Sequence, residues 1–157
     1  SNLFQGSQIV SSKNKIIIST NDFTYIIDNK TGSILHKKNF SSMIKPLLIN
    51  NYLFIVTKNN FLISLNLENG SIIYSYEINE QVSDFLKLKK KKVSFKSMAM
   101  SNKSILIFLE NAFVLQYNVN GRLEDIKKLP TKIKSDPIFI DKSLIYLDKK
   151  NKISLLN

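Results

Sequence analysis

The chain has 157 residues, of which 43% are hydrophobic and 10% aromatic, so it can fold around a buried core. It contains no cysteine, which excludes disulfides, thiolate catalysis and cysteine-ligated metals. The net charge is +11, but 22 of the 23 basic residues are lysine and only Arg122 is arginine. Because dedicated phosphate-binding sites favour the bidentate arginine fork, we attribute the charge to compositional bias and expect no nucleic-acid partner.

One strand pattern recurs along the chain. Four segments contain a short β-rich run that ends in aspartate or asparagine, at Asp28, Asn66, Asn118 and Asn157. These end residues are 38, 52 and 39 positions apart. Self-similarity over this length is typical of repeat architectures, so we treat each copy as one structural unit.

Each copy has two further apolar runs before the shared strand. The copies open with residues 8–10, 46–49, 98–100 and 137–140, and continue with 16–18, 53–56, 105–109 and 144–147. Pro46 and Pro137 both lie 20 positions before their strand end. Proline suits the first residue of a strand, where it removes no ladder hydrogen bond, so both positions predict strand starts.

A turn and a last strand follow the first three copies. The turns cover residues 29–32, 67–70 and 119–121, and each ends in glycine, which accepts the positive φ of tight hairpins. The predicted last strands cover 33–37, 71–77 and 122–127, whereas the fourth copy stops at Asn157 before any such strand.

Four short strands in about 40 residues are typical of a propeller blade. We therefore predict an all-β fold, a β-propeller of four tandem four-stranded antiparallel blades, the last without its outer strand. The blades are placed at residues 7–42, 43–80, 93–130 and 133–157. A β-sandwich of irregular hairpins is the alternative, and four copies in one register disfavour it.

The copies resemble the blades of pyrroloquinoline-quinone-type propellers. That blade motif reads Leu-Tyr-Ala-Leu-Asp, two variable residues, Thr-Gly, two variable residues and Leu-Trp, and segments 25–35 and 63–74 are similar to it. The family includes quinoprotein alcohol dehydrogenases and BamB-like lipoproteins of the bacterial outer-membrane β-barrel assembly machinery. The resemblance covers nearly the whole chain and implies the fold more strongly than any activity.

The chain departs from the motif at the positions that matter for catalysis. The family's tryptophan is replaced by His36, Tyr74 and Asp125, and the cysteine pair and ligand cluster of the quinone enzymes have no counterpart. The resemblance therefore implies the non-catalytic, BamB-like branch, without cofactor or metal. It implies a scaffold for protein partners such as the outer-membrane assembly machinery, in the bacterial periplasm or at the inner face of the outer membrane. A fragment of a quinone-dependent dehydrogenase is the alternative.

Four blades would make half of a seven- or eight-bladed ring. An open half-ring would expose apolar blade faces to water, which is unfavourable. We expect either the remainder of a longer chain or a second copy, in a homodimer, to complete the ring. In both cases we expect Leu155 to pair with a strand from another segment.

An insertion at residues 80–96 interrupts the repeat. Residues 81–88 are predicted to form a short helical turn, with Val82, Phe85 and Leu86 packed inward. The insertion also holds a candidate interaction loop, which would meet an acidic partner, anionic lipid or nucleic acid; its residues are Lys87, Lys89, Lys90, Lys91 and Lys92. A merely solvated loop is the simpler interpretation.

Other candidate residues have structural interpretations. His36 is the only histidine and is expected to pack at an outer strand. The scattered carboxylates are expected to cap turns rather than to catalyse; they are Asp22, Asp28, Asp141 and Asp148. A recurrent phenylalanine is expected to pack between blades, at Phe23, Phe61 and Phe113.

Overall fold

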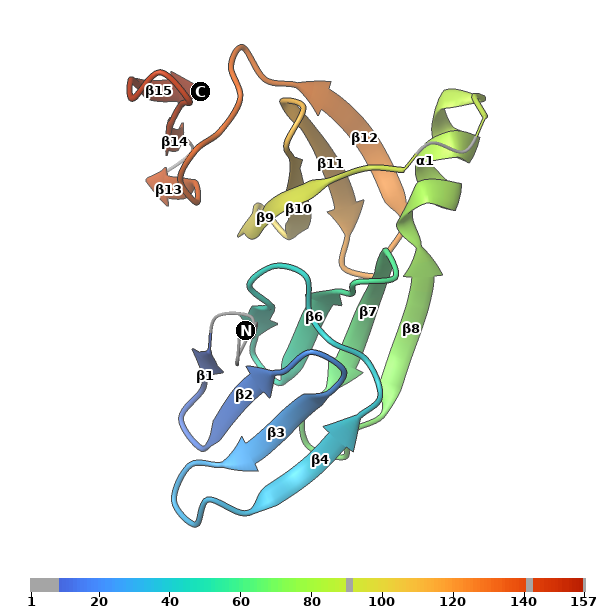
Figure 1. The fold of residues 1–157 in the computed structure, drawn as a ribbon, viewed down its shortest axis with the longest axis vertical. Helices are drawn as coiled ribbons and strands as arrows, with labels where there is room; N and C mark the ends of the chain where they lie inside the picture. Colours follow the sequence, from blue (N-terminus) through green and yellow to red (C-terminus); the bar gives the residue numbers. More distant parts are fainter. Residues whose placement is uncertain (1–8, 90–91, 141–142, 157) are drawn as a thin grey trace. The chain divides into compact units, whose positions relative to one another are not determined.

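The computed structural model describes residues 9–89, 92–140 and 143–156 (Figure 1). The chain forms two compact units, residues 1–78 and 79–157, which are described separately below. Both units consist of small antiparallel sheets, and the architecture is that of a partial β-propeller. Asp141 and Asn157 of the predictions above lie outside the described residues.

The first unit contains two four-stranded sheets with the strand orders β1-β2-β3-β4 and β5-β6-β7-β8. We call these sheets blade 1 and blade 2. The strands of blade 1 are β1 (Val10–Ser11), β2 (Lys15–Ser19), β3 (Thr24–Asp28) and β4 (Ile34–Lys38). Those of blade 2 are β5 (Leu47–Ile49), β6 (Tyr52–Val56), β7 (Phe61–Asn66) and β8 (Ile72–Glu77).

The second unit contains blade 3, with the strand order β12-β11-β10-β9, and blade 4, a three-stranded sheet of order β13-β14-β15. Helix α1 (Ile78–Leu86) precedes them in the chain. The strands of blade 3 are β9 (Phe95–Ser101), β10 (Ser104–Leu109), β11 (Phe113–Asn118) and β12 (Leu123–Lys128). Those of blade 4 are β13 (Ile138–Ile140), β14 (Ser143–Leu147) and β15 (Ile153–Leu156), so the predicted fourth blade has three strands.

Successive blades within a unit pack face to face. In the first unit, Ile17 and Ile26 of blade 1 form a buried cluster with Leu53, Ile55 and Leu65 of blade 2. In the second unit, one cluster joins the facing sides of blades 3 and 4; its members include Phe108, Val114, Leu144 and Tyr146. We call the side that a blade turns to the following blade its forward face, and the opposite side its backward face.

The end residue of the shared strand closes the turn that follows it. Asp28 Oδ1 accepts hydrogen bonds from the backbone N–H groups of Lys30 and Thr31, at 2.9 and 2.8 Å. The amide oxygens of Asn66 and Asn118 accept equivalent bonds in blades 2 and 3. The repeated Asp or Asn is therefore an Asx-turn residue, which explains why the template ends on it.

A β-bulge lies at the same place in the outer strand of each four-stranded blade, and blade 3 has a further register shift between Phe108 and Leu109. In blade 1, Ile27 pairs with Ile34 while Ile26 pairs with His36, so that Leu35 is the extra residue. The same offset leaves Ile73 unpaired in β8 and Glu124 unpaired in β12. The bulge bends each outer strand directly after its turn.

Helix α1 corrects part of the prediction for the insertion. The helix begins at Ile78 and ends at Leu86, and Val82 is buried as expected. Phe85 and Leu86 do not pack inward, because each is 45% exposed. The apolar side of the helix is therefore buried at its start and exposed at its end.

The recurrent phenylalanines are also less buried than predicted. Phe23, Phe61 and Phe113 are each only partly covered, so they lie at the margin of their blades rather than at the centre of the packing. Phe23 directly precedes β3, and Phe61 and Phe113 are the first residues of β7 and β11.

Candidate functional site

The forward face of blade 4 is a continuous apolar surface. Residues directly opposite one another in an antiparallel ladder point to the same face, so Ile138, Ile145 and Leu155 share one side of the sheet. Ile140 and Ile153 lie on that side by the alternation of strand residues. Ile138 is 60% exposed, Ile140 54%, Ile153 78% and Leu155 57%.

The counterparts of Ile153 and Leu155 are buried in other blades. Val114 of blade 3, which stands four residues before the strand end as Ile153 does, is 6% exposed. Ile26 of blade 1, equivalent to Leu155, is fully buried against blade 2. The forward face of blade 4 therefore has the residue chemistry of a blade-to-blade contact, and no following blade covers it among the described residues.

The backward face of blade 1 is open in the same sense. Ile16, Ile18 and Ile27 are only partly buried on that side, whereas the equivalent Leu53 and Leu65 of blade 2 are fully buried by blade 1. Lys37 covers part of this face, with its Nζ 3.9 Å from the ring centre of Phe23.

His36 lies on the outer strand β4, as the sequence predicted, and packs there against blade 2. Its Nε2 lies 3.4 Å from the carbonyl oxygen of Glu68 in the turn after β7. A Cβ added to Gly70 of that turn would lie 2.6 Å from His36 Nδ1. The imidazole thus packs against the turn of blade 2 that contains Gly70. In the blade motif described above, tryptophan stands at the position of His36.

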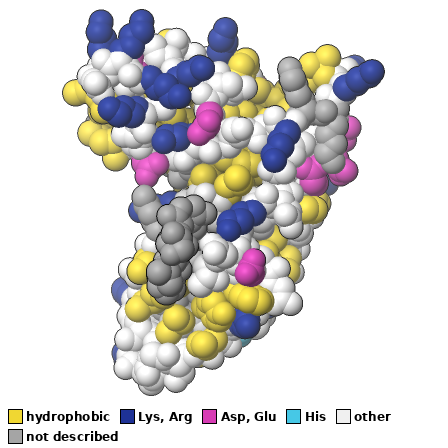
Figure 2. Space-filling model, in the orientation of Figure 1, with side chains coloured by type: hydrophobic (Ala, Val, Ile, Leu, Met, Phe, Trp, Pro, Cys, Tyr) yellow, Lys and Arg dark blue, Asp and Glu magenta, His cyan; other side chains and the backbone are white. Residues whose placement is uncertain are grey.

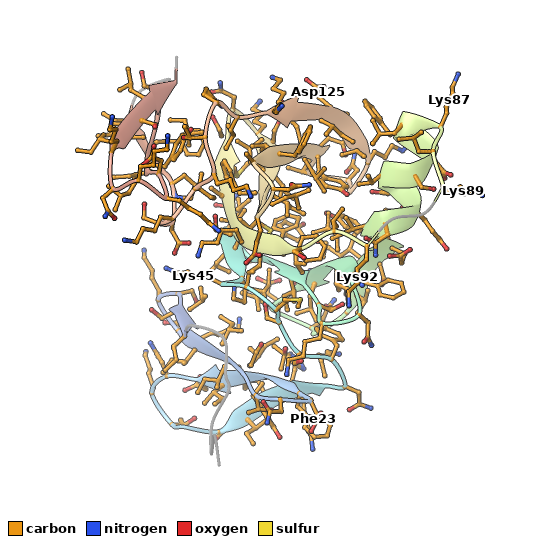
Figure 3. The ribbon with its side chains drawn as sticks, turned by 45° about the horizontal axis from the view of Figure 1, so that its top comes forward. Phe23, Lys45, Lys87, Lys89, Lys92 and Asp125 are labelled. Atoms are coloured by element: carbon orange, nitrogen blue, oxygen red, sulfur yellow. The ribbon has the colours of Figure 1, made fainter. Side chains whose placement is uncertain are left out.

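Helix α1 is fixed to the second unit near its start and projects at its end. Gln81 Nε2 donates to the carbonyl oxygen of Gly121 at 3.0 Å, and the Val93 N–H donates to Asn79 Oδ1 at 3.0 Å. Lys87 and Lys89 follow the last turn of the helix, are exposed, and point outward in Figure 3. Lys90 and Lys91, also predicted for this loop, lie outside the described residues.

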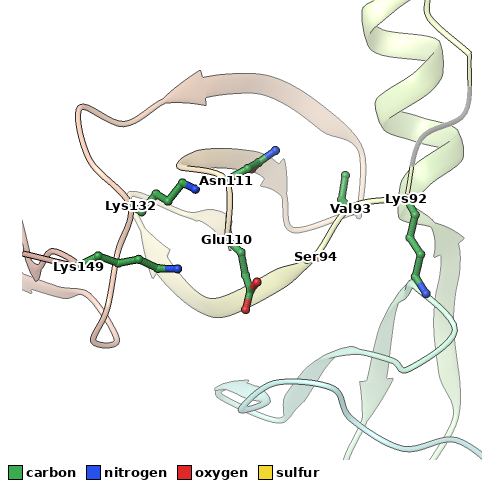
Figure 4. Close-up of a pocket in the computed structure, with 7 residues that line it drawn as sticks. All are labelled: Lys92, Val93, Ser94, Glu110, Asn111, Lys132 and Lys149. Atoms are coloured by element: carbon green, nitrogen blue, oxygen red, sulfur yellow. The ribbon is translucent and has the colours of Figure 1, made fainter.

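A hollow of about 300 Å³ lies in the second unit beside the predicted loop (Figure 4). Lys132 and Lys149 point toward the side of the hollow that holds Glu110, while Lys92 points away from them. The hollow is open and mainly polar, and it has the features of a solvated junction between loops rather than of an enclosed catalytic pocket.

Asp28 and Asp148 cap turns as predicted, and Asp22 lies exposed in the bend before β3. Asp148 Oδ1 accepts from the backbone N–H groups of Lys150 and Lys152, at 2.8 and 2.9 Å. In both Asp28 and Asp148 the bonds are accepted by the same carboxylate oxygen, Oδ1. In the described part of the chain no three potential metal-ligating side chains come together. No described helix has the length and apolar character to cross a bilayer.

On the face seen in Figure 2, several Lys or Arg side chains gather in the upper part of the view, and others lie singly among neutral and apolar side chains.

Searches with the sequence find no matching protein family and no matching curated protein. The fold, in contrast, is similar to solved structures. BamB from Moraxella catarrhalis matches with a TM-score of 0.74 over 95% of this chain, at 10% identity. The computationally designed Ika4 protein matches with a TM-score of 0.67 over 96% of this chain, at 12% identity.

A quinohemoprotein alcohol dehydrogenase from Comamonas testosteroni matches with a TM-score of 0.62 over 78% of this chain, also at 12% identity. The chain spans 42% of the BamB chain and 20% of the dehydrogenase, but 88% of Ika4. These similarities define the class of fold, a β-propeller of the kind found in BamB and the quinone dehydrogenases. At such identities they extend to the fold alone.

Proposed function

We propose that this chain is a non-catalytic propeller scaffold for protein–protein contacts, and that its first contact is with further propeller blades. The open forward face of blade 4 is the observation that carries the proposal. It presents four strongly exposed aliphatic side chains, Ile138, Ile140, Ile153 and Leu155. The counterparts of the last two are buried, Val114 in blade 3 and Ile26 in blade 1.

The partner we propose for this face is the backward face of blade 1 in a second copy of the chain. Forward and backward faces already pack together between blades 1 and 2 and between blades 3 and 4. Because the two faces of such a contact differ, the association is head-to-tail, and two copies would close a ring of eight blades. A longer polypeptide that supplies the remaining blades would use the same two faces.

The contact is tested by sedimentation of the purified chain and of the variant Ile153→Lys/Leu155→Lys. We expect a concentration-dependent dimer that the variant abolishes while its circular dichroism stays that of a β protein. Lys150→Glu/Lys152→Glu, next to this strand but off the apolar face, is the matched control and should still dimerise. A wild-type chain that is folded and monomeric at high concentration would refute the second-copy partner.

The role we propose for the completed scaffold is that of BamB-like proteins, in the assembly of outer-membrane β-barrel proteins in the periplasm. The blade motif and the similarity of fold to BamB support it. A bacterium that lacks its own BamB provides the test, since periplasmic expression of the chain should restore its outer-membrane protein levels. Unchanged levels, with the chain present and folded in the periplasm, would argue against this role.

The competing function is quinone-dependent dehydrogenation. It is supported by the similarity of fold to the quinohemoprotein alcohol dehydrogenase. Reconstitution with pyrroloquinoline quinone and Ca²⁺, followed by a dye-linked dehydrogenase assay, separates the two. We expect no turnover of primary alcohols, and turnover above the protein-free blank would overturn the non-catalytic proposal.

A further inference from the structure

We propose that the end of helix α1 binds an anionic membrane surface. The binding element, which we call the α1 tip, consists of Phe85, Leu86, Lys87, Leu88 and Lys89. Three of these side chains are large and apolar, with exposures of 45%, 45% and 65% for Phe85, Leu86 and Leu88. The two lysines between and after them are exposed as well.

The apolar stripe of the helix extends beyond its own packing site. Ile78, Val82 and Phe85 follow one another at spacings of four and three residues, which places them on one side of an α-helix. Ile78 is fully buried and Val82 is 8% exposed, but Phe85 is 45% exposed. The first half of this apolar side, with Ile78 and Val82, is buried in the protein. The second half, with Phe85, is available for a partner.

The tip is held in this exposed position by its backbone. The Leu88 N–H donates to the Ser83 carbonyl at 3.0 Å, and the Lys87 N–H donates to the Asp84 carbonyl at 3.3 Å. Lys87 has φ 53°, so these bonds form a Schellman ending with a left-handed residue. The closed ending, together with the hydrogen bonds of Gln81 and Asn79, keeps the apolar side chains from folding back onto the sheet.

The side-chain chemistry fits a lipid surface better than the other anionic partners. Helices that lie in the membrane interface combine phenylalanine and leucine on one side with lysine at the polar boundary. Protein interfaces favour aromatic residues, methionine and arginine and are depleted of lysine, so Phe85 would suit either surface and the lysines favour lipid. Specific nucleic-acid readout relies on arginine, and the α1 tip has none. The lysine ammonium groups complement anionic headgroups without needing a fixed geometry.

Co-sedimentation of the chain with vesicles tests the proposal. Vesicles with about one-third phosphatidylglycerol carry the negative surface charge, and pure phosphatidylcholine vesicles are the neutral reference. We expect binding only to the anionic vesicles, weakened by salt. Lys87→Gln/Lys89→Gln should lower the partition coefficient about tenfold or more, and Leu86→Ser/Leu88→Ser should lower it by about tenfold.

Matched variants distinguish the tip from the charge of the whole chain. Lys128→Gln/Lys150→Gln removes two exposed lysines elsewhere in the second unit, and Ile34→Ser/Leu35→Ser removes two exposed aliphatic side chains in the first. Both controls should bind within about twofold of the wild type. Equal binding to neutral vesicles, no binding to anionic ones, or an equal loss in the controls would each overturn the proposal. Tip-dependent binding to DNA or to an acidic peptide without binding to vesicles would also overturn it.

Discussion

The imidazole of His36 lies directly against the backbone of Gly70 in the following blade, where an added Cβ would come within 2.6 Å of Nδ1. No larger residue fits at position 70 unless the ring moves. The pair thereby fixes how closely the outer strand of blade 1 approaches the last turn of blade 2. A polar ring takes the position that tryptophan occupies in the related blade motif.

We predict that Gly70→Ala is far more destabilising than Gly32→Ala. Both glycines have positive φ, +70° and +72°, so alanine is strained at either position, by about 1 kcal/mol. Gly32 has no atom within 4 Å of an added Cβ, whereas Gly70 meets the imidazole. Urea unfolding should give a loss of about 2–4 kcal/mol for Gly70→Ala.

The double variant His36→Ala/Gly70→Ala isolates the contact. With the ring removed, adding the Gly70 methyl should cost only about the 1 kcal/mol of backbone strain. A Gly70→Ala cost that is the same with and without the imidazole would show that the steric explanation is wrong.

Lys103→Gly should stabilise the second unit. Asn102 and Lys103 connect β9 and β10 with φ values of 47° and 67°, the two left-handed residues of a type I′ hairpin turn. Glycine adopts this conformation without strain, and the exposed lysine loses no packing, so we expect a gain of about 0.5–1 kcal/mol in urea unfolding. Lys30→Gly is the control, because Lys30 is exposed in a turn without positive φ and should gain nothing.

The turn after β3 should carry an acid-dependent contribution to stability. Hydrogen bonds from the backbone and hydroxyl of Thr31, and then from the backbone of Lys30, hold the pKa of Asp28 below its ordinary 3.8. Because the folded pKa is lowered, this stabilisation is present above pH 3.8 and is lost as the pH falls through the folded value. Asp28→Ala should lower the melting temperature at pH 7, and its difference from wild type should shrink in acid.

Asp28→Asn tests the charge separately from the cap. Asparagine fills the same position in blades 2 and 3, so this variant should keep the turn. Because asparagine does not ionise, the part of the acid dependence of stability that comes from residue 28 should disappear. An unchanged pH profile of melting temperature in Asp28→Asn would exclude the carboxylate as its source.

Phe108 should be the most sensitive position in the second unit. It is fully buried in the cluster that joins blades 3 and 4, next to Leu144 and Tyr146. Phe108→Ala should cost about 3–5 kcal/mol and increase hydrogen exchange across β14 and β15. The half-buried Phe113 supplies the comparison, and a Phe113→Ala variant that is equally destabilised would contradict this ranking.

The repeat pattern predicted the strands, their turns and the missing outer strand of blade 4, because period-two alternation and turn residues act over a few positions. The packing of His36 followed from its place in the template. The exposure of Phe85 and Leu86 was not predictable, since their spacing matches that of the buried Ile78 and Val82. The position at which the rest of the protein ceases to cover a helix is set by tertiary structure, which the local sequence pattern does not contain.

The bulges in the outer strands could not be predicted from residue types. Their extra residues, Leu35, Ile73 and Glu124, share no chemistry, and only the common offset from the preceding turn relates them. A structure of one blade would have been enough to place the bulge in the others.

The repeated bulge also directs how these blades can associate. Each outer strand, β4, β8 and β12, is an unpaired edge that could in principle recruit another strand and extend without limit, as fibrils do. The kink beside each turn breaks the straight run of hydrogen-bonding groups that such growth requires. Association is left to the apolar faces, which are the surfaces of the ring contact proposed above. If blades add by these faces as proposed, we expect a finite, closed assembly and not a fibril.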